Sequence, residues 1–263
     1  HPQALQPHQQ GARCHNGGGI YNDTQGAVTL NHSTISGNSA KSYDGGGIDN
    51  FGALTLNHSI VAKNSASSEP DISSSFGGVT AEGVNLLSDL AGSNLVDDDN
   101  VNVGDPQLAP LGWYGGPVQT MHPLAGSPAI DVPGTMNPGG TDARGYARFV
   151  GTGLDIGAVE VGPVVTVNNA GDDVLIDMTL RKAIANADTP GTVIRFNAGV
   201  FPATIAHGDE IVIDSGKSIF IDASDLSGPV VIDSGDSGRI FRIADAASTL
   251  AIHGLTLTNG NAE

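Results

Sequence analysis

The feature that most restricts the fold is an internal repeat near the start of the chain. The segment Gly-Gly-Gly-Ile-Tyr-Asn at 17–22 returns as Gly-Gly-Gly-Ile-Asp-Asn at 45–50, 28 residues later. The segment Gly-Ala-Val-Thr-Leu-Asn-His-Ser at 26–33 returns as Gly-Ala-Leu-Thr-Leu-Asn-His-Ser at 52–59, 26 residues later. A repeat period in this range is typical of solenoid proteins, in which each repeat packs on its neighbours.

Within each repeat, apolar residues alternate with polar ones, as Val28 and Leu30 do in one repeat and Leu54 and Leu56 do in the next. Asn and Gly separate these runs and suit bends. Short strands with such bends indicate coils that stack about 4.8 Å apart, the spacing of neighbouring strands. We therefore predict a mainly β fold, a right-handed parallel β-helix (solenoid) with one short capping helix. The alternative is an ordinary β-sandwich with two similar hairpins.

The composition limits the kind of hydrophobic core that the chain can form and the kinds of partner that it can bind. The 263 residues include 37 Gly and 14 Pro, and aromatic residues make up only 5%, so the core must be thin and aliphatic. The net charge of −17 predicts repulsion of nucleic acid and of anionic lipid. Because no apolar run approaches the roughly 20 residues of a membrane helix, we expect no membrane span. The single cysteine, Cys14, excludes an internal disulfide framework.

The remaining sequence divides into an irregular part and a second alternating part. Residues 67–161 are irregularly spaced and rich in Gly and Pro, whereas residues 164–249 alternate again. Residues 250–262 then parallel 28–40, so a third copy of the first repeat lies at the far end of the chain.

One helical pattern interrupts the second alternating part. Its apolar residues recur at i, i+3, i+4 and i+7 and are Leu180, Ala183, Ile184 and Ala187. Asp177 or Thr179 is expected to cap its start, and the Pro-Gly pair at 190–191 is expected to stop it. A single amphipathic helix beside the first strands suits a lid over the open end of a solenoid core.

These segments resemble bacterial secreted right-handed parallel β-helix proteins with a choice-of-anchor Q-like domain. The Gly-rich coils at 17–66 resemble their coils, and 180–187 resembles their capping helix. The strings that resemble the Q-like domain are Asp-Pro-Gln-Leu (105–108), Gly-Gly-Pro (115–117), Gly-Ser-Pro-Ala-Ile-Asp (126–131), Thr-Asp-Ala-Arg-Gly (141–145) and Asp-Ile-Gly-Ala-Val-Glu (155–160). The resemblance implies the fold and a secreted, extracellular or cell-surface location, and it implies no reaction.

The order of these segments differs from the order usual in the family, which runs from helix cap through coils to the Q-like end. Here we expect an N-terminal arm at 1–16, β-helix coils forming the end of one block at 17–100, and a Q-like end region at 101–161. The capping helix and coils at 164–263 then begin the next block. The chain resembles the back of one β-helix joined to the front of another.

This order predicts self-assembly. The third repeat stops at Glu263, where a coil like that at Gly17 should follow. Closing the gap within one chain would cross roughly 30 Å of stacked coils, whereas the link from Val161 to Val164 reaches only about 11 Å. We therefore expect copies to stack head to tail. The arm at 1–16 is expected to be either a clasp along the neighbour or a disordered tail. The expected interface residues are Gly17, Gly18, Gly19, Ile20, Leu30, Leu255, Leu257 and Asn259.

The function that we predict is a structural subunit of an extracellular filament, with copies of the chain itself as the partner. One alternative is a fragment of a large surface repeat adhesin or a glycan-binding module, with glycans as partners. A polysaccharide-degrading enzyme is a further alternative that we favour less, because no motif marks a pair of carboxylates or a strong base. We expect no enzymatic activity.

Candidate ligand-binding residues have simpler interpretations. The run Asp97-Asp98-Asp99-Asn100 offers oxygen ligands for Ca²⁺ but lacks the spaced calcium loop, so a solvated loop is favoured. His32 and His58 occupy equivalent coil positions and are expected to form a polar ladder on the outer face. No catalytic, cofactor-binding or metal-ligating residue is assigned, and no cofactor is expected.

The Q-like segment is expected to have a structural role. Arg144 among Asp131, Asp142 and Asp155 suggests ion pairs that tie loops together. Its larger apolar residues are expected to bury an end of the solenoid, since an unpaired coil end is a sticky edge. Those residues are Trp113, Met121, Leu124, Ile130, Ile156 and Val159.

Overall fold

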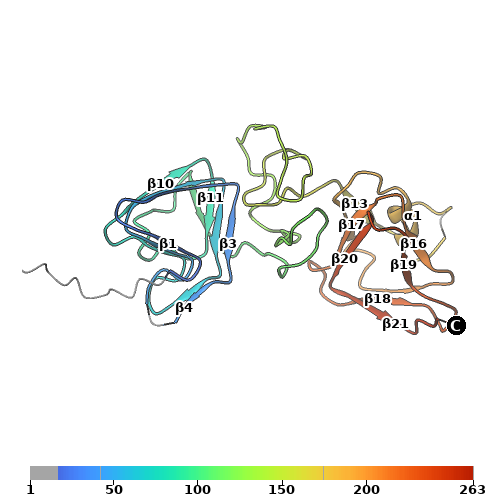
Figure 1. Ribbon diagram of the computed structural model, residues 1–263. Coiled ribbons are helices and arrows are strands. Elements are labelled where there is room, and N and C mark those ends of the chain that lie inside the picture. The colour runs from blue at the N-terminus through green and yellow to red at the C-terminus, as the bar shows by residue number, and fades with distance from the viewer. Residues whose placement is uncertain (1–16, 42, 174, 263) are drawn as a thin grey trace, which may run out of the picture.

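Two stacks of β-strand coils lie side by side, joined by a region of loops, in the computed structural model of the protein (Figure 1). The structure describes residues 17–41, 43–173 and 175–262. We call residues 17–104 the first stack, residues 105–161 the loop region and residues 164–262 the second stack. The expected N-terminal arm, with Cys14, and the terminal Glu263 lie outside the described residues.

The first stack consists of short parallel strands that wind through successive coils. In chain order they are β1 (Ile20–Asn22), β2 (Ala27–Asn31), β3 (Thr34–Ser36), β4 (Ser39–Ala40), β5 (Ile48–Asn50), β6 (Ala53–Asn57), β7 (Ile60–Ala62), β8 (Ser65–Ala66), β9 (Ile72–Ser73), β10 (Gly78–Glu82), β11 (Asn85–Leu87) and β12 (Val101–Val103). They form the sheets β1-β5-β9, β2-β6-β10, β3-β7-β11-β12 and β4-β8. Because β12 pairs with β11, the first stack extends past its expected end at residue 100.

Alternation in the sequence becomes alternation between the core and the outer face. Leu54 and Leu56 of β6 are fully buried, and β2 and β10 pair with β6 residue by residue on either side. Equivalent side chains therefore form columns through successive coils, as Val28, Leu54 and Val79 do. The described core of this stack is aliphatic, as the composition predicts.

Glycines and amides join the coils of the first stack. A Cβ atom on Gly18 would lie 2.2 Å from the carbonyl oxygen of Gly46, so the repeated Gly triplet is needed where successive coils approach closely. The side-chain amide of Asn22 donates to Oδ1 of Asn50 (2.7 Å), and that of Asn50 donates to Oγ of Ser74 (2.9 Å). This buried ladder crosses three coils.

The second stack has the same parallel pairing with longer connections. Its elements are β13 (Val164–Val167), α1 (Leu180–Ala185), β14 (Thr192–Phe196), β15 (Thr204–Ala206), β16 (Ile211–Ile213), β17 (Ser218–Asp222), β18 (Val230–Asp233), β19 (Phe241–Ile243), β20 (Thr249–His253) and β21 (Leu255–Thr258). They form the sheets β13-β14-β17-β20, β15-β18-β21 and β16-β19.

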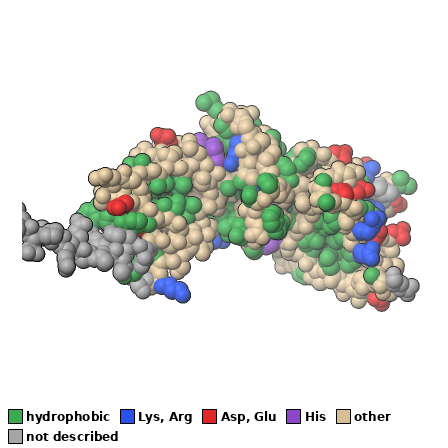
Figure 2. Space-filling model, viewed as in Figure 1, with side chains coloured by type: hydrophobic (Ala, Val, Ile, Leu, Met, Phe, Trp, Pro, Cys, Tyr) green, Lys and Arg blue, Asp and Glu red, His purple; other side chains and the backbone are tan. Residues whose placement is uncertain are grey.

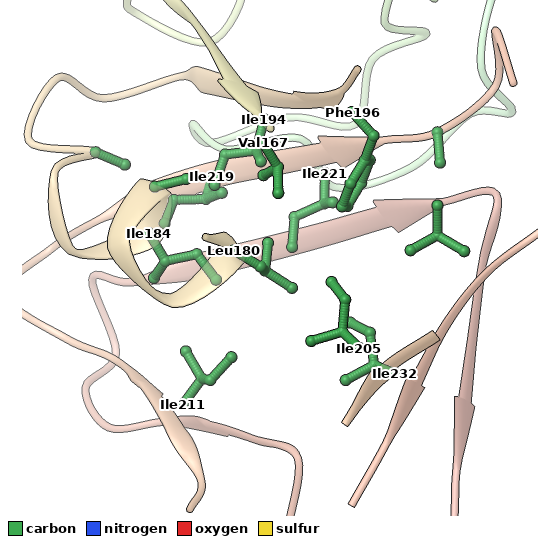
Figure 3. Close-up of a cluster of buried hydrophobic side chains, with 14 of the residues drawn as sticks. Val167, Leu180, Ile184, Ile194, Phe196, Ile205, Ile211, Ile219, Ile221 and Ile232 are labelled. Atoms are coloured by element: carbon green, nitrogen blue, oxygen red, sulfur yellow. The ribbon is translucent and has the colours of Figure 1, made fainter. Parts of the chain in front are cut away.

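Helix α1 forms where the periodicity predicts it and ends at Ala185, before Ala187, the last residue of the apolar pattern. Thr179 is its N-cap, and its side chain accepts from the N–H of Lys182 (3.2 Å). The four apolar residues of the pattern are all buried in one core cluster. In Figure 3, Leu180 and Ile184 point from the helix into this core. Since β13 pairs on one side only, α1 covers that end of the second stack.

The loop region packs against the sides of both stacks, whereas we expected it to cover a coil end. Trp113 is 59% exposed and takes no part in either contact, so that expectation is wrong. Met121, Leu124 and Ile130 are half-buried, and Ile156 and Val159 are buried. One cluster joins Leu108, Ala129, Val132 and Ile156 to Ile60, Ala62 and Leu86 of the first stack. A second joins Ala109, Tyr114 and Leu124 to Val193, Phe220 and Ala251 of the second stack.

Tyr114, the neighbour of Trp113, packs against the second stack although no role was predicted for it. Its ring meets Phe220 edge to face at 5.0 Å between centroids, and the outer face of β17 presents that phenylalanine. The prediction of a mainly β, parallel β-solenoid with one short helix is confirmed. Among the described residues, no helix is long and apolar enough to cross a bilayer.

Candidate assembly interface

The outermost coil of the first stack has strand edges without a partner strand among the described residues, and part of its core is open. Strand β2, for example, lies at the edge of its sheet and, within 17–262, pairs with β6 alone. Leu56 of β6 is fully buried, whereas its column neighbour Leu30 of β2 is only half-buried. Ile35 of β3 is likewise half-buried beside the fully buried Val61.

The outermost coil of the second stack shows the same gradient. Strands β20 and β21 lie at the edges of their sheets. Ile252 is 37% exposed although its column neighbour Ile221 is fully buried. Leu257 is 45% exposed beside the fully buried Ile232. Apolar side chains that face inward are therefore left partly open to solvent at this coil, and exposed apolar side chains are visible on both stacks in Figure 2.

An open hollow of about 340 Å³ lies at the outer edge of the second stack. Its apolar floor is formed by Ile240 and Leu257, and Asn259 lies on its polar rim. Asn259 also donates to Oδ1 of Asp233 (2.8 Å), which holds its side chain against the preceding coil.

The expected interface residues lie at two separate coil ends. Gly17, Gly18, Gly19, Ile20 and Leu30 belong to the outermost coil of the first stack, and Leu255, Leu257 and Asn259 to that of the second. Within one chain these groups belong to different stacks. Four further residues at these coil ends were not among the expected interface residues. Val28 and Ile35 are partly buried members of the first stack's core, and Ile243 and Ile252 are exposed apolar side chains of the second stack.

Arg144 and Asp142 form a buried ion pair in the loop region. Nη2 of Arg144 lies 2.8 Å from Oδ2 of Asp142, and both side chains are almost fully buried. The same guanidinium donates to the carbonyl oxygens of Tyr114 and Glu160. A planar fork that reaches three loop segments ties them together.

Asp131 and Asp155, which we expected beside Arg144, instead accept from backbone N–H groups. Oδ1 of Asp131 accepts from Thr152 (2.7 Å), and Oδ2 of Asp155 accepts from Val161 (2.6 Å). These carboxylates therefore fix turns rather than pair with the arginine. Burial raises the pKa of Asp155 to about 6.

Glu160 and Arg148 complete this polar cluster, and the sequence analysis missed both. Glu160 accepts from the N–H of Val150 (2.8 Å) and of Asp155 (3.1 Å). Burial, followed by the nearby Asp155 carboxylate, raises the pKa of Glu160 to about 8. Arg148 is buried and donates to the carbonyl oxygen of Gly157 (2.9 Å), close to the first stack.

His32 and His58 stack as the repeat predicts. Their ring centroids lie 5.2 Å apart with 18° between the planes. Burial, followed by the charge of Arg148, lowers the pKa of His32 to about 4. In Figure 2, histidine side chains lie beside a basic side chain where the first stack meets the loop region. The neutral rings form a coil-to-coil contact.

A polar row crosses the outer face of the second stack, and the sequence analysis did not identify it. Arg195, Asp222 and His253 occupy β14, β17 and β20, and Asp222 lies 3.9 Å from each of the other two. Asp222 is fully buried and accepts from the N–H of Ala125 (2.9 Å). Asp222 therefore fastens the loop region to the second stack.

The acidic run at 97–100 is an exposed turn, in which Oδ1 of Asp98 accepts from the N–H of Asn100 (2.9 Å). In the part of the chain that the structure describes, no group of three or more His, Cys, Asp and Glu side chains could hold a metal ion.

Comparison of the chain with family models, curated proteins and solved structures finds no match.

Proposed function

We propose that this protein is a structural subunit of an extracellular filament, in which copies stack head to tail through their β-helix coils. The observation that carries the proposal is the pair of coil ends, each with an unpaired strand edge and half-buried core residues. Such edges are templates for pairing with another chain.

The two ends differ from each other, so the contact between copies is heterologous. One surface contains β2 and β3, and the other contains β20 and β21. A contact of this kind propagates from copy to copy into an open filament, unless the rotation between copies closes a ring. The secreted or cell-surface location is part of the proposal and is supported by the resemblance to secreted β-helix proteins.

Two polar groups of the described residues have structural roles, which supports a non-enzymatic role for this part of the molecule. Arg144 and Asp142 tie loops, and the buried Asp222 accepts a backbone N–H from the loop region. The second candidate function is a segment of a large surface repeat adhesin that contacts glycans. The same open edges favour it, because further coils of a longer chain would cover them as well as a second copy would.

Negative-stain electron microscopy and sedimentation of the purified chain, over a wide range of concentration in about 0.15 M salt, test the filament. We expect fibres, or closed rings, whose population grows with concentration. An intact chain that stays monomeric at high concentration would exclude assembly and leave the adhesin candidate. Reducing sugar released from a panel of polysaccharides would instead favour the enzyme alternative.

A pair of matched variants makes the test specific. Leu257→Lys places a charge on the proposed contact, at a side chain that is already 45% exposed. Val118→Lys is the control, because Val118 is 46% exposed in the loop region, away from both coil ends. Leu257→Lys should abolish fibres with little loss of stability, and Val118→Lys should preserve them. Equal assembly of the two variants would contradict the proposed surface.

A further inference from the structure

We infer that the contact between copies has one defined register, in which β20 pairs with β2 and β21 with β3 of the next copy. In this register Leu250 lies over Val28, Ile252 over Leu30, and Leu257 over Ile35. The inference rests on the proposed function and adds to it the residue-by-residue pairing.

The side-chain directions support this register. In the second stack, Leu250 and Ile252 continue the inward columns of Ile219 and Ile221. In the first stack, the inward columns begin with Val28 and Leu30 and continue in Leu54 and Leu56. A shift of the joint by one residue would place every inward side chain opposite an outward one.

The bend between the two strands also matches. In the second stack, β17 and β18 are separated by residues 223–229, but β20 and β21 are separated by Gly254 alone. Gly254 has φ +78, and the bends at the same place in the first stack, His32 and His58, have φ 45 and 47. The last coil of the second stack therefore has the one-residue left-handed bend of the first stack in place of the long connection found in the preceding coil of its own stack.

A second left-handed position fixes the register along the strand. Asn259 has φ 54 and follows β21 directly. In the first stack, Gly37 (φ +73) follows β3 and Lys63 (φ 57) follows β7. In each of these coils the two left-handed residues are the same distance apart in sequence. The same difference in residue number therefore relates the two left-handed positions of the one coil to those of the other, and the three apolar pairs of the proposed register to each other. A shift by two residues would keep inward side chains opposite inward ones but would misalign the left-handed positions.

The strand edges gain partners in this arrangement. The free N–H and C=O groups of β2 and β20 face each other as in an internal parallel pair, about 4.8 Å apart. The half-buried column residues at both ends become fully buried, like Leu56 and Ile221 inside the stacks.

Cysteine cross-linking tests the register, with Cys14→Ser as the background. Ser36 and Thr258 flank the inward Ile35 and Leu257, and the proposed register places them directly opposite each other. Cα atoms in that position are close enough for a disulfide. The matched control replaces Ser36 and Thr256 with cysteine, because Thr256 faces the same way but lies about 7 Å further along the strand, out of reach.

On a non-reducing gel, we expect Ser36→Cys/Thr258→Cys to form a ladder of disulfide-linked oligomers and Ser36→Cys/Thr256→Cys to remain mostly monomeric. Fibres that form while only the control pair cross-links, or while neither pair does, would overturn the register and leave the filament intact. A Cys14→Ser chain that is monomeric under all conditions would overturn the proposed function and the register together.

Discussion

The two stacks share one architecture but hold their coils together differently. In the first stack, buried amides bridge successive coils around a core of aliphatic residues, as those of Asn22 and Asn50 do, and the ladder ends on the hydroxyl of Ser74. In the second, larger apolar side chains fill the core, including Phe196 and Phe201, whose rings meet at 5.0 Å, and α1 closes one end. A cross-coil amide bond such as Asn197 to Asn168 lies at its surface.

This difference explains why the repeat runs through successive coils of the first stack but returns only in the last coil of the second. A buried amide ladder needs the same residue type at the same place in each coil, since each amide must bond the next. An apolar column accepts Val, Leu, Ile or Phe as long as its volume is filled. The sequence repeat therefore marks polar ladders and tight corners, and its absence from residues 164–249 of the second stack is compatible with the same fold.

The largest loss of stability is expected from a substitution in the loop region, which contacts both stacks. Arg144→Ala removes the counter-ion of the buried Asp142, and loss of one member of a buried pair typically costs about 3–5 kcal/mol. Denaturant unfolding should show this loss in the free energy of unfolding. Arg239→Ala is the control, since Arg239 is half exposed and solvent screens its pair with Glu210 (3.0 Å), so its loss should change stability little. An unchanged melting temperature in Arg144→Ala would contradict the structural role.

A smaller loss of stability is expected when an amide of the first stack is removed, and a still smaller one when an amide of the second stack is removed. Asn50→Ala removes the centre of the buried ladder and leaves its neighbours short of partners, at a cost of about 1–3 kcal/mol. Asn168→Ala in the second stack removes only an exposed bond and should change stability by less than about 0.5 kcal/mol. Thermal or denaturant unfolding measures both. If the two variants lose similar stability, the amide ladder is not what distinguishes the stacks.

The sequence predicted the elements whose pattern is local. The Gly triplets, the alternating Val28 and Leu30, and the spacing of Leu180 and Ile184 each correspond to one backbone geometry, and the coils and the helix follow from them. The stacking of His32 on His58 follows from their equal place in the repeat.

The placement of the loop region could not be predicted, because it depends on contacts between segments far apart in the chain. Nothing in the sequence distinguishes Trp113, which is exposed, from Tyr114, which packs on Phe220. The clustering of Asp, Glu and Arg was visible, but the choice of Asp142 as the partner of Arg144 depends on how the loops fold. Glu160 and Asp222 become significant only through the backbone N–H groups that reach them.

A pH dependence of the stability is also expected, and its largest single source lies in the loop region. Burial raises the pKa of Glu160 to about 8 from its ordinary value near 4.5, so the folded chain holds this proton more tightly than the unfolded chain. The stability that this proton contributes is fully present below the ordinary pKa and is lost as pH rises through about 8. Between those values, one proton changes the free energy of unfolding by at most about 1.4 kcal/mol per pH unit.

Glu160→Gln should remove this slope, because the amide keeps the shape of the side chain and cannot ionise. Denaturant unfolding at a series of pH values between the two pKa values measures it, with wild type compared at each pH. The pKa of Asp155, raised to about 6, contributes with the same sign at lower pH, and the pKa of His32, lowered from 6.5 to about 4, contributes with the opposite sign below pH 6.5. Both remain in the variant, so the comparison is made between pH 6.5 and 8. Because neither stack contains Glu160, a slope that persists unchanged in Glu160→Gln would place the titrating group elsewhere and contradict this assignment.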